Sequence, residues 1–125
     1  TDLSPLALGK KCREPEFGFM QGMGHTYQWK DGHEWRAVRD KQYTYARYLI
    51  DGSELLFDNI ADPRQTQNLV NHREYDKILK RMRKQMQTKM HELKDEFKPC
   101  SWYRGKWVDE ERCIQAAAKG PFKQQ

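Results

Sequence analysis

Three short segments in the middle of the chain are rich in aromatic and β-branched residues, with turn-forming residues between them. They span residues 34–40, 42–50 and 53–58, and runs of this kind are typical of β-strands. Asp51-Gly52 favours a two-residue hairpin turn between the last two, because glycine tolerates a positive φ and aspartate often does. The pattern predicts a three-stranded antiparallel meander, to which the first thirty residues contribute an optional fourth edge strand.

A helical period follows the last strand. Asp62-Pro63 ends that strand, because proline has no amide donor and restricts the residue before it. Asn71 stands three residues before Glu74, a capping-box-like spacing that predicts a helix start. From there apolar side chains recur at steps of three or four over about 24 residues. The stripe consists of Tyr75, Ile78, Leu79, Met82, Met86, Met90, Leu93 and Phe97.

We expect this stripe to pack on one face of the meander and Lys98-Pro99 to end the helix. The three methionines also suit a peptide-binding groove, but core packing is the simpler interpretation. The predicted fold is therefore α+β, with a small antiparallel meander of three to four strands packed against one long amphipathic C-terminal helix. Its length of 125 residues suits one domain.

The chain divides into three regions by composition. Residues 1–32 form an irregular, glycine-containing lead-in and loop, and residues 33–97 hold the sheet and the helix. Residues 98–125 form a tail in which 109–119 predict a short second helix.

The net charge of +5 makes polyanions the partners to consider. Much of the excess lies on the polar face of the predicted helix, as a basic ridge of Lys77, Lys80, Arg81 and Lys84. One hypothesis is therefore a stand-alone basic module that binds a heparin-like glycan or nucleic acid. Acidic residues dispersed among the basic ones argue against it.

Other sites and segments are not supported by the sequence. No apolar run approaches the roughly 18 residues of a membrane span, and no signal-peptide pattern is present. The chain starts at Thr1, so we expect it to be a piece of a longer protein. Cys12, Cys100 and Cys113 have no paired metal-ligand spacing, and the histidines are dispersed, so no structural zinc is expected. A Cys100–Cys113 disulfide and free thiols both stay open.

One combined pattern points to a family. It consists of a Trp-Arg-Ala-Val-Arg strand, a Tyr-x-Tyr strand, a Glu-Leu-x-x-Asp strand and an Asp-Pro turn that leads through Asn-Leu to a long helix. These elements fall at Trp35 to Arg39, Tyr43 to Tyr45, Glu54 to Asp58, Asp62-Pro63 with Thr66, and Asn68-Leu69. Their order resembles the C-terminal subdomain of sulfatases, in the alkaline-phosphatase-like superfamily.

The resemblance extends from residue 2 to about residue 97, because residues 2–9 are also similar to a family segment. Phe57 stands where the family more often has tyrosine, and Gln65 where it often has glutamate. The tail beyond Lys98 has no counterpart in this pattern.

The resemblance implies a parent enzyme that hydrolyses sulfate esters with calcium and a formylglycine made from a Cys/Ser-x-Pro-x-Arg motif. The sequence around Cys12 does not fit that motif, because Pro15 falls one position too late and no arginine follows at the required place. Nothing else offers a hydrolase site, since Ser4, Ser53 and Ser101 lack a nucleophile elbow. "GMGH" at 22–25 also lacks the partners of a phosphate loop. We expect no cofactor on this chain.

The leading interpretation is a C-terminal sulfatase fragment that is inactive without the N-terminal catalytic domain, its expected partner. One helix covers one sheet face, so the other face needs that domain, and the isolated chain is expected to self-associate. The resemblance places the parent in the periplasm, outside the cell or in the lysosome.

Aromatic residues supply the candidate contacts to substrate, which the resemblance implies is a sulfated carbohydrate or an aryl sulfate. His25, Tyr27 and Trp29 lie in a glycine-flexible segment and are candidates for the rim of the substrate cleft, although covering the sheet is the simpler interpretation. Trp35 and Tyr45 are expected in the core. In the tail, Trp102, Tyr103 and Trp107 suit either packing or recognition.

Overall fold

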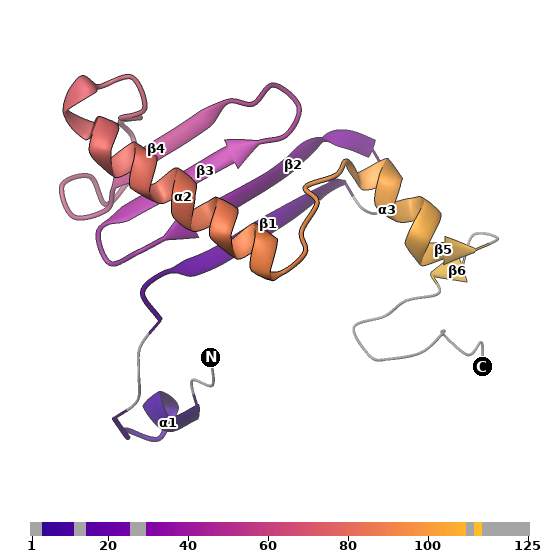
Figure 1. Cartoon of the computed structure of the whole chain (residues 1–125), viewed down its shortest axis with the longest axis horizontal. Helices are drawn as coiled ribbons and strands as arrows, with labels where there is room; N and C mark the ends of the chain where they lie inside the picture. Colours follow the sequence, from indigo (N-terminus) through magenta and orange to yellow (C-terminus); the bar gives the residue numbers. More distant parts are fainter. Residues whose placement is uncertain (1–3, 12–14, 26–29, 110–111, 114–125) are drawn as a thin grey trace.

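The computed structural model describes residues 4–11, 15–25, 30–109 and 112–113 (Figure 1). A short helix, α1 (Ser4–Ala7), precedes strands β1 (Gly18–His25), β2 (Lys30–Arg39), β3 (Tyr43–Tyr48) and β4 (Glu54–Asp58). A 3₁₀ turn, η1 (Arg73–Tyr75), leads into the long helix α2 (Asp76–Glu92). The chain continues through α3 (Cys100–Trp107) to the short strands β5 (Val108–Asp109) and β6 (Arg112–Cys113).

The first four strands form one antiparallel sheet in the order β1-β2-β3-β4. The three predicted strands are confirmed as β2, β3 and β4, and β1 supplies the fourth, edge strand. This strand and the start of β2 fall within residues 1–32, where the sequence pattern indicated an irregular segment. The α+β class is confirmed.

The hairpin between β3 and β4 is longer than the predicted two-residue turn. Gly52 has a φ of +67°, as the Asp-Gly pattern indicated, but the amide of Tyr48 donates to the carbonyl of Ser53 at 2.9 Å, which leaves residues 49–52 as the loop. Leu49 donates instead to the carbonyl of Glu34 in β2, at 3.0 Å. The chain therefore stays paired to β2 beyond the point where it leaves β4.

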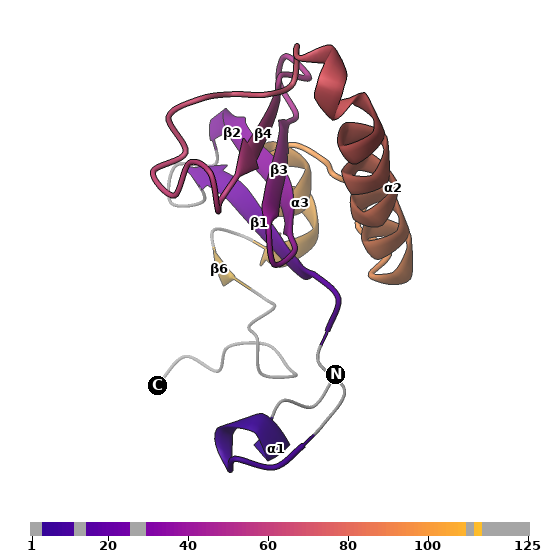
Figure 2. The same ribbon diagram turned by 90° about the vertical axis from the view of Figure 1, so that its left-hand side faces the viewer.

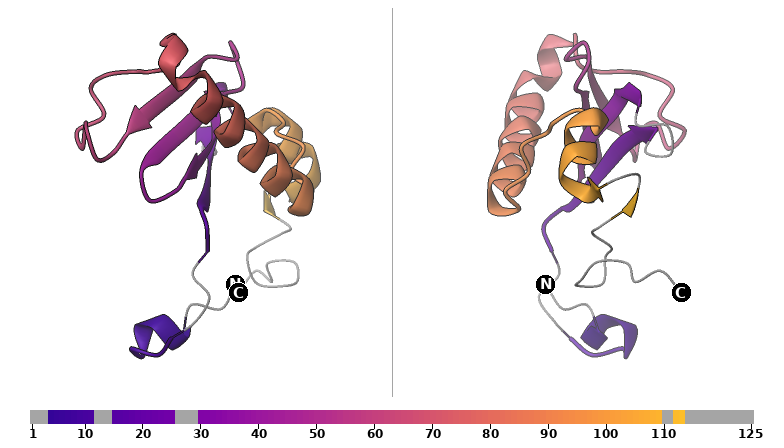
Figure 3. Two further views of the ribbon diagram at one scale, coloured as in Figure 1. Left: turned by 60° about the vertical axis from the view of Figure 1, so that its left-hand side comes forward. Right: turned by 90° about the vertical axis from the view of Figure 1, so that its right-hand side faces the viewer.

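Helix α2 lies across one face of the sheet, which we call the helix face (Figures 1 and 3). Val38, Tyr45 and Leu56 from three adjacent strands meet Met82 and Met86 from the helix, and all are buried. The same core includes Leu69 and Leu79. Packing of the methionine stripe and burial of Tyr45 are thus as predicted, and apolar burial of this kind is the main stabilising term in a small domain.

Both ends of α2 differ from the prediction. The capping box is wrong: neither His72 before η1 nor Tyr75 before α2 makes a side-chain cap hydrogen bond. The helix ends at Glu92 rather than after Phe97, because Lys94 and Phe97 take positive φ angles of +54° and +48°. Leu93 is 56% exposed, so it leaves the apolar stripe.

A buried ion pair explains why the helix stops early. The Arg36 guanidinium in β2 is buried and binds the Asp95 carboxylate, with Nη2 to Oδ1 at 2.9 Å. Burial acts to raise the pKa of Asp95, but hydrogen bonds from Arg36 and from the Phe97 amide hold it below its usual value. Arg36 also lies 4.6 Å from the centre of the Phe97 ring. The turn after α2 is the conformation that brings Asp95 and Phe97 to Arg36.

A second buried carboxylate fixes the start of α3. Glu34 accepts hydrogen bonds from the amides of Gly32, at 2.8 Å, and Cys100, at 2.7 Å. Asp31 accepts two further bonds, from the amide and the hydroxyl of Ser101. Helix α3, which the sequence pattern did not indicate, is thereby joined to β2.

The tail agrees only in part with the sequence prediction. The predicted helix over 109–119 is wrong at residues 109 and 112–113, which are strands, and its other residues lie outside the described part of the chain. Cys100 is buried as a free thiol, one of the two alternatives left open. Within the described residues, no helix is long and apolar enough to cross a membrane.

Gly22 offers a test of packing on the opposite sheet face. Gly22 is the strand partner of Trp35, and a Cβ at this position would overlap the indole ring. Gly22→Ala should therefore lower the free energy of unfolding by about 1–3 kcal/mol, measured by urea denaturation. Gly18→Ala is the matched control on the same strand and face, since its Cβ would lie 4.0 Å from the nearest atom, the Arg39 carbonyl oxygen. Equal stabilities of the two variants would contradict this account.

Candidate functional site

The predicted rim residues are only partly described. His25 ends β1, where its backbone pairs with Lys30, and its side chain lies outside the described part of the structure. Tyr27 and Trp29 also lie outside it. Their role at a substrate cleft stays a prediction.

Helix α3 brings tail aromatics to β1 and β2. Trp102 and Tyr103 are half-buried and meet edge to face, with ring centres 4.9 Å apart. Half-buried rings in edge-to-face contact are typical of packed aromatic side chains, so this geometry favours packing for the pair. The side chain of Trp107 lies outside the described part.

The basic ridge is divided by a contact to the sheet. Lys77, Lys80 and Lys84 are exposed on α2. Arg81 instead donates to Asp40 Oδ2 at 2.7 Å and lies 5.9 Å from the centre of the Tyr43 ring. Burial acts to raise the pKa of Asp40, but hydrogen bonds from the Tyr43 and Gln42 amides and from Arg81 hold it below its usual value. Polyanion binding by the ridge stays a prediction.

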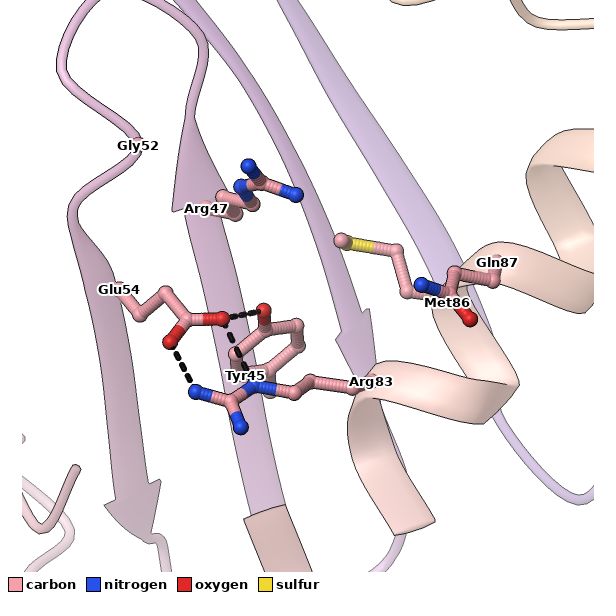
Figure 4. Close-up of a pocket in the computed structure, with 7 residues that line it drawn as sticks. All are labelled: Tyr45, Arg47, Gly52, Glu54, Arg83, Met86 and Gln87. Carbon is pink, nitrogen blue, oxygen red and sulfur yellow. Dashed lines mark hydrogen bonds and ion pairs between the residues drawn. The ribbon is translucent and has the colours of Figure 1, made fainter. Parts of the chain in front are cut away.

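A pocket of about 330 Å³ lies between the β3–β4 hairpin and α2. Two arginines mark it, so we call it the Arg47–Arg83 pocket (Figure 4). It is lined by Tyr45, Arg47, Gly52, Glu54, Arg83, Met86 and Gln87. Three separate elements position these side chains: β3, the hairpin with β4, and α2. Sequence reasoning missed the pocket, because it depends on how the helix lies across the sheet.

The inner wall of the pocket is a hydrogen-bonded triad. The Tyr45 hydroxyl donates to Glu54, and Arg83 binds the same carboxylate through Nε, at 2.9 Å, and Nη2 (Figure 4). The Arg83 bonds lower the pKa of Glu54. Burial, with the Glu54 contact, raises the pKa of Tyr45, and the Glu54 contact raises that of Arg83. The pair is therefore charged and the phenol neutral at neutral pH.

This arrangement suits binding more than catalysis. A general acid or base works best when its pKa lies near the operating pH, and these three groups are shifted away from neutrality. Among the described residues, no group of three or more histidine, cysteine, aspartate or glutamate side chains is placed to hold a metal ion. The calcium and formylglycine of the sequence analysis concern the catalytic domain and stay predictions.

The second sheet face carries no helix of the described chain. Figure 2 shows α2 on one side of the sheet and the loop between β4 and η1 on the other. Strand alternation and register place seven apolar residues on this second face. They are Met20, Trp35, Ala37, Ala46, Tyr48, Leu55 and Phe57. Trp35, expected in the core, is half-buried here instead.

The Asp-Pro turn is held by side chains that cap backbone amides. Asp62 Oδ2 accepts from the amides of Thr66, at 2.6 Å, and Gln67, at 2.8 Å. Asn68 accepts from the Leu56 amide at 2.9 Å and donates to the Glu54 carbonyl at 3.1 Å, so it pairs with β4 like a strand residue. Short polar side chains are the ones that close such turns. These residues of the family-like pattern are structural.

Comparison with known proteins tests the resemblance of this chain to sulfatases. The ulvan-active sulfatase of Formosa agariphila is 41% identical over 73 residues, which are 58% of this chain and 14% of that protein. Two solved structures, a 2-O GAG sulfatase and a candidate sulfatase from Bacteroides thetaiotaomicron, are each 26% identical, with TM-scores of 0.70 and 0.69. The resemblance to the sulfatase family is confirmed.

The sulfatase match concerns a small part of those proteins. Each of the two solved structures matches 78% of this chain, but the matched part is only 21% of each of those proteins. In the ulvan-active sulfatase the matched part is 14% of the protein. No family model matches the chain. The sulfatase likeness thus describes a subdomain-sized unit.

Glu54 should make the stability of this unit depend on pH. Its folded-state pKa lies below the ordinary value of 4.5, so its contribution is present above about pH 4.5 and is lost as pH falls through the folded pKa. Glu54→Gln should cost about 1–3 kcal/mol at pH 7, because it weakens hydrogen bonds to a charged group. It should also flatten the acid limb of a plot of unfolding free energy against pH.

Glu92→Gln is the matched control, since the Glu92 side chain is 53% exposed in its ion pair with Lys89. Its effect should stay within about 0.5 kcal/mol. An unchanged acid limb in Glu54→Gln would refute the role given to the triad.

Proposed function

We propose that this chain is the C-terminal subdomain of a sulfatase, a sulfuric ester hydrolase, and that it is inactive without the N-terminal catalytic domain. Its role is structural: it packs against that domain and completes the rim of the substrate cleft. The similarity to a small part of longer sulfatases supports this assignment. The comparisons give no support to the alternative, a stand-alone polyanion module.

The apolar second sheet face is the observation that carries the structural role. An antiparallel sheet that faces water on one side normally alternates apolar and polar residues. Here Leu55 and Phe57 in β4, Ala46 in β3 and Met20 in β1 are apolar on the side away from α2. Most of these side chains are half-buried and Met20 is 39% exposed, and apolar side chains left partly open to solvent on one face are typical of an interaction surface. We assign this surface to the catalytic domain, and in its absence to self-association of the isolated chain.

The bond-breaking chemistry belongs to the catalytic domain in this proposal. Calcium and a formylglycine nucleophile would act there, on the sulfate group. The names of two relatives, one active on ulvan and one a GAG sulfatase, support a sulfated carbohydrate as substrate. His25, Tyr27 and Trp29 are the candidates of this chain for contact with it.

The coding sequence before Thr1 tests the proposal. We expect an open reading frame with a Cys/Ser-x-Pro-x-Arg motif several hundred residues upstream. The longer polypeptide, produced with the formylglycine modification and calcium, should hydrolyse an aryl sulfate. The 125-residue chain alone should show no turnover under the same conditions.

Two results would overturn the assignment. One is a start codon directly before Thr1, which would leave no room for a catalytic domain on the same chain. The other is calcium-dependent turnover by the 125-residue chain itself.

A further inference from the structure

We propose that the Arg47–Arg83 pocket binds the sulfate or carboxylate group of an acidic sugar unit. This inference goes beyond the proposed function, which places catalysis and its sulfate site on another domain. It rests on three features of the pocket: a compensated inner carboxylate, an uncompensated arginine at the mouth, and a volume suited to one sugar.

The inner carboxylate does not present a free negative charge. Glu54 accepts hydrogen bonds from the Tyr45 hydroxyl and from two nitrogens of Arg83, and its side chain is 17% exposed. The charge of Arg83 offsets that of Glu54. Nη1 of Arg83 takes no part in the contact with Glu54.

Arg47 supplies the uncompensated positive charge. Its side chain is exposed, and its guanidinium lies beside the turn, where a Cβ at Gly52 would be 3.7 Å from Nη2. Figure 4 shows this guanidinium apart from the triad, with no hydrogen bond or ion pair to the residues drawn. Its effect on Glu54 is a longer-range electrostatic one. A planar guanidinium binds sulfate and carboxylate oxygens in pairs, which makes Arg47 the natural anion contact.

The rest of the lining suits a sugar ring. The volume of about 330 Å³ lies near the lower end of the roughly 300–1,000 Å³ of small-molecule sites. The amide of Gln87 offers a hydrogen-bonding partner for hydroxyl groups. The Met86 side chain adds an apolar surface beside Arg47 (Figure 4). One monosaccharide with a single anionic group therefore matches the pocket in size and chemistry.

Titration of the 125-residue chain followed by NMR tests this site without any catalysis. Glucuronate and glucose 6-sulfate should each shift the Nε–H signals of Arg47 and Arg83 in a saturable way at constant ionic strength. Neutral glucose should not shift them. Inorganic sulfate should bind more weakly than glucose 6-sulfate, because it lacks the ring.

Arg47→Gln should weaken binding of both acidic sugars at least about tenfold, the effect of losing one charge-assisted contact. The matched control is Arg39→Gln, another exposed strand arginine, which lies on the second sheet face. It should leave both affinities unchanged. Arg47→Gln should also unfold at the same urea concentration as the parent chain, since Arg47 makes no hydrogen bond in the pocket.

Four results would overturn the inference. These are the absence of saturable shifts, equal loss of affinity in Arg47→Gln and Arg39→Gln, equal binding of neutral glucose, and inorganic sulfate binding as tightly as glucose 6-sulfate. None of them bears on whether the parent protein is a sulfatase, because that question is decided by the longer polypeptide.

Discussion

One helix can cover only one face of a four-stranded sheet, and this constraint shapes the whole unit. Tyr45 and Leu56 from the sheet and Met82 from α2 are almost fully buried where the two layers meet. The long helix α2 covers that face. The opposite face keeps an apolar surface that the described chain leaves without a helix. The sulfatase similarity supports the proposal that a further domain covers this face, because the matched proteins extend well beyond the unit seen here.

The residues that carry the likeness act mainly on the fold. Arg36, within the Trp-Arg-Ala-Val-Arg strand, is buried and holds Asp95 by an ion pair and Phe97 by a cation–π contact, so the chain leaves the helix before these residues. Asp62 and Asn68 close the turn before the helix by capping amides. Removing the partner of a buried arginine leaves an unpaired buried charge, which destabilises a fold far more than the loss of an exposed ion pair. The pattern thus reports an architecture, and the bond-breaking chemistry is left to the proposed catalytic domain.

Local patterns predicted most of this architecture. Aromatic and β-branched runs located β2, β3 and β4, the Asp-Gly pair located the hairpin, and the 3.6-residue period located the buried side of α2. What failed depended on distant residues. Arg36 and Asp95 are 59 positions apart, and only their pairing shows that Phe97 leaves the helix. The one sequence signal for this pairing was that Glu34 and Arg36 share a strand face with the apolar Val38. Charged side chains on a core-facing side of a strand indicate buried partners.

For the candidate sites, too, local patterns predicted single residues and missed contacts between distant ones. Burial of Tyr45 was predicted from its strand, whereas its hydroxyl partner Glu54 and the arginine from α2 were not, because the helix crossing angle decides which side chains meet. The apolar second face followed from the fold class, and the register now gives its residues.

Hydroxyl-radical footprinting with mass spectrometry tests the role of that face most directly. Met20 is 39% exposed on it, and Leu93 is 56% exposed at the end of α2. In the 125-residue chain, measured at low concentration to limit self-association, both residues should be oxidised readily. In the longer polypeptide with the catalytic domain, oxidation of Met20 should fall several-fold while Leu93 stays reactive. Equal oxidation of Met20 in the two proteins would contradict the account.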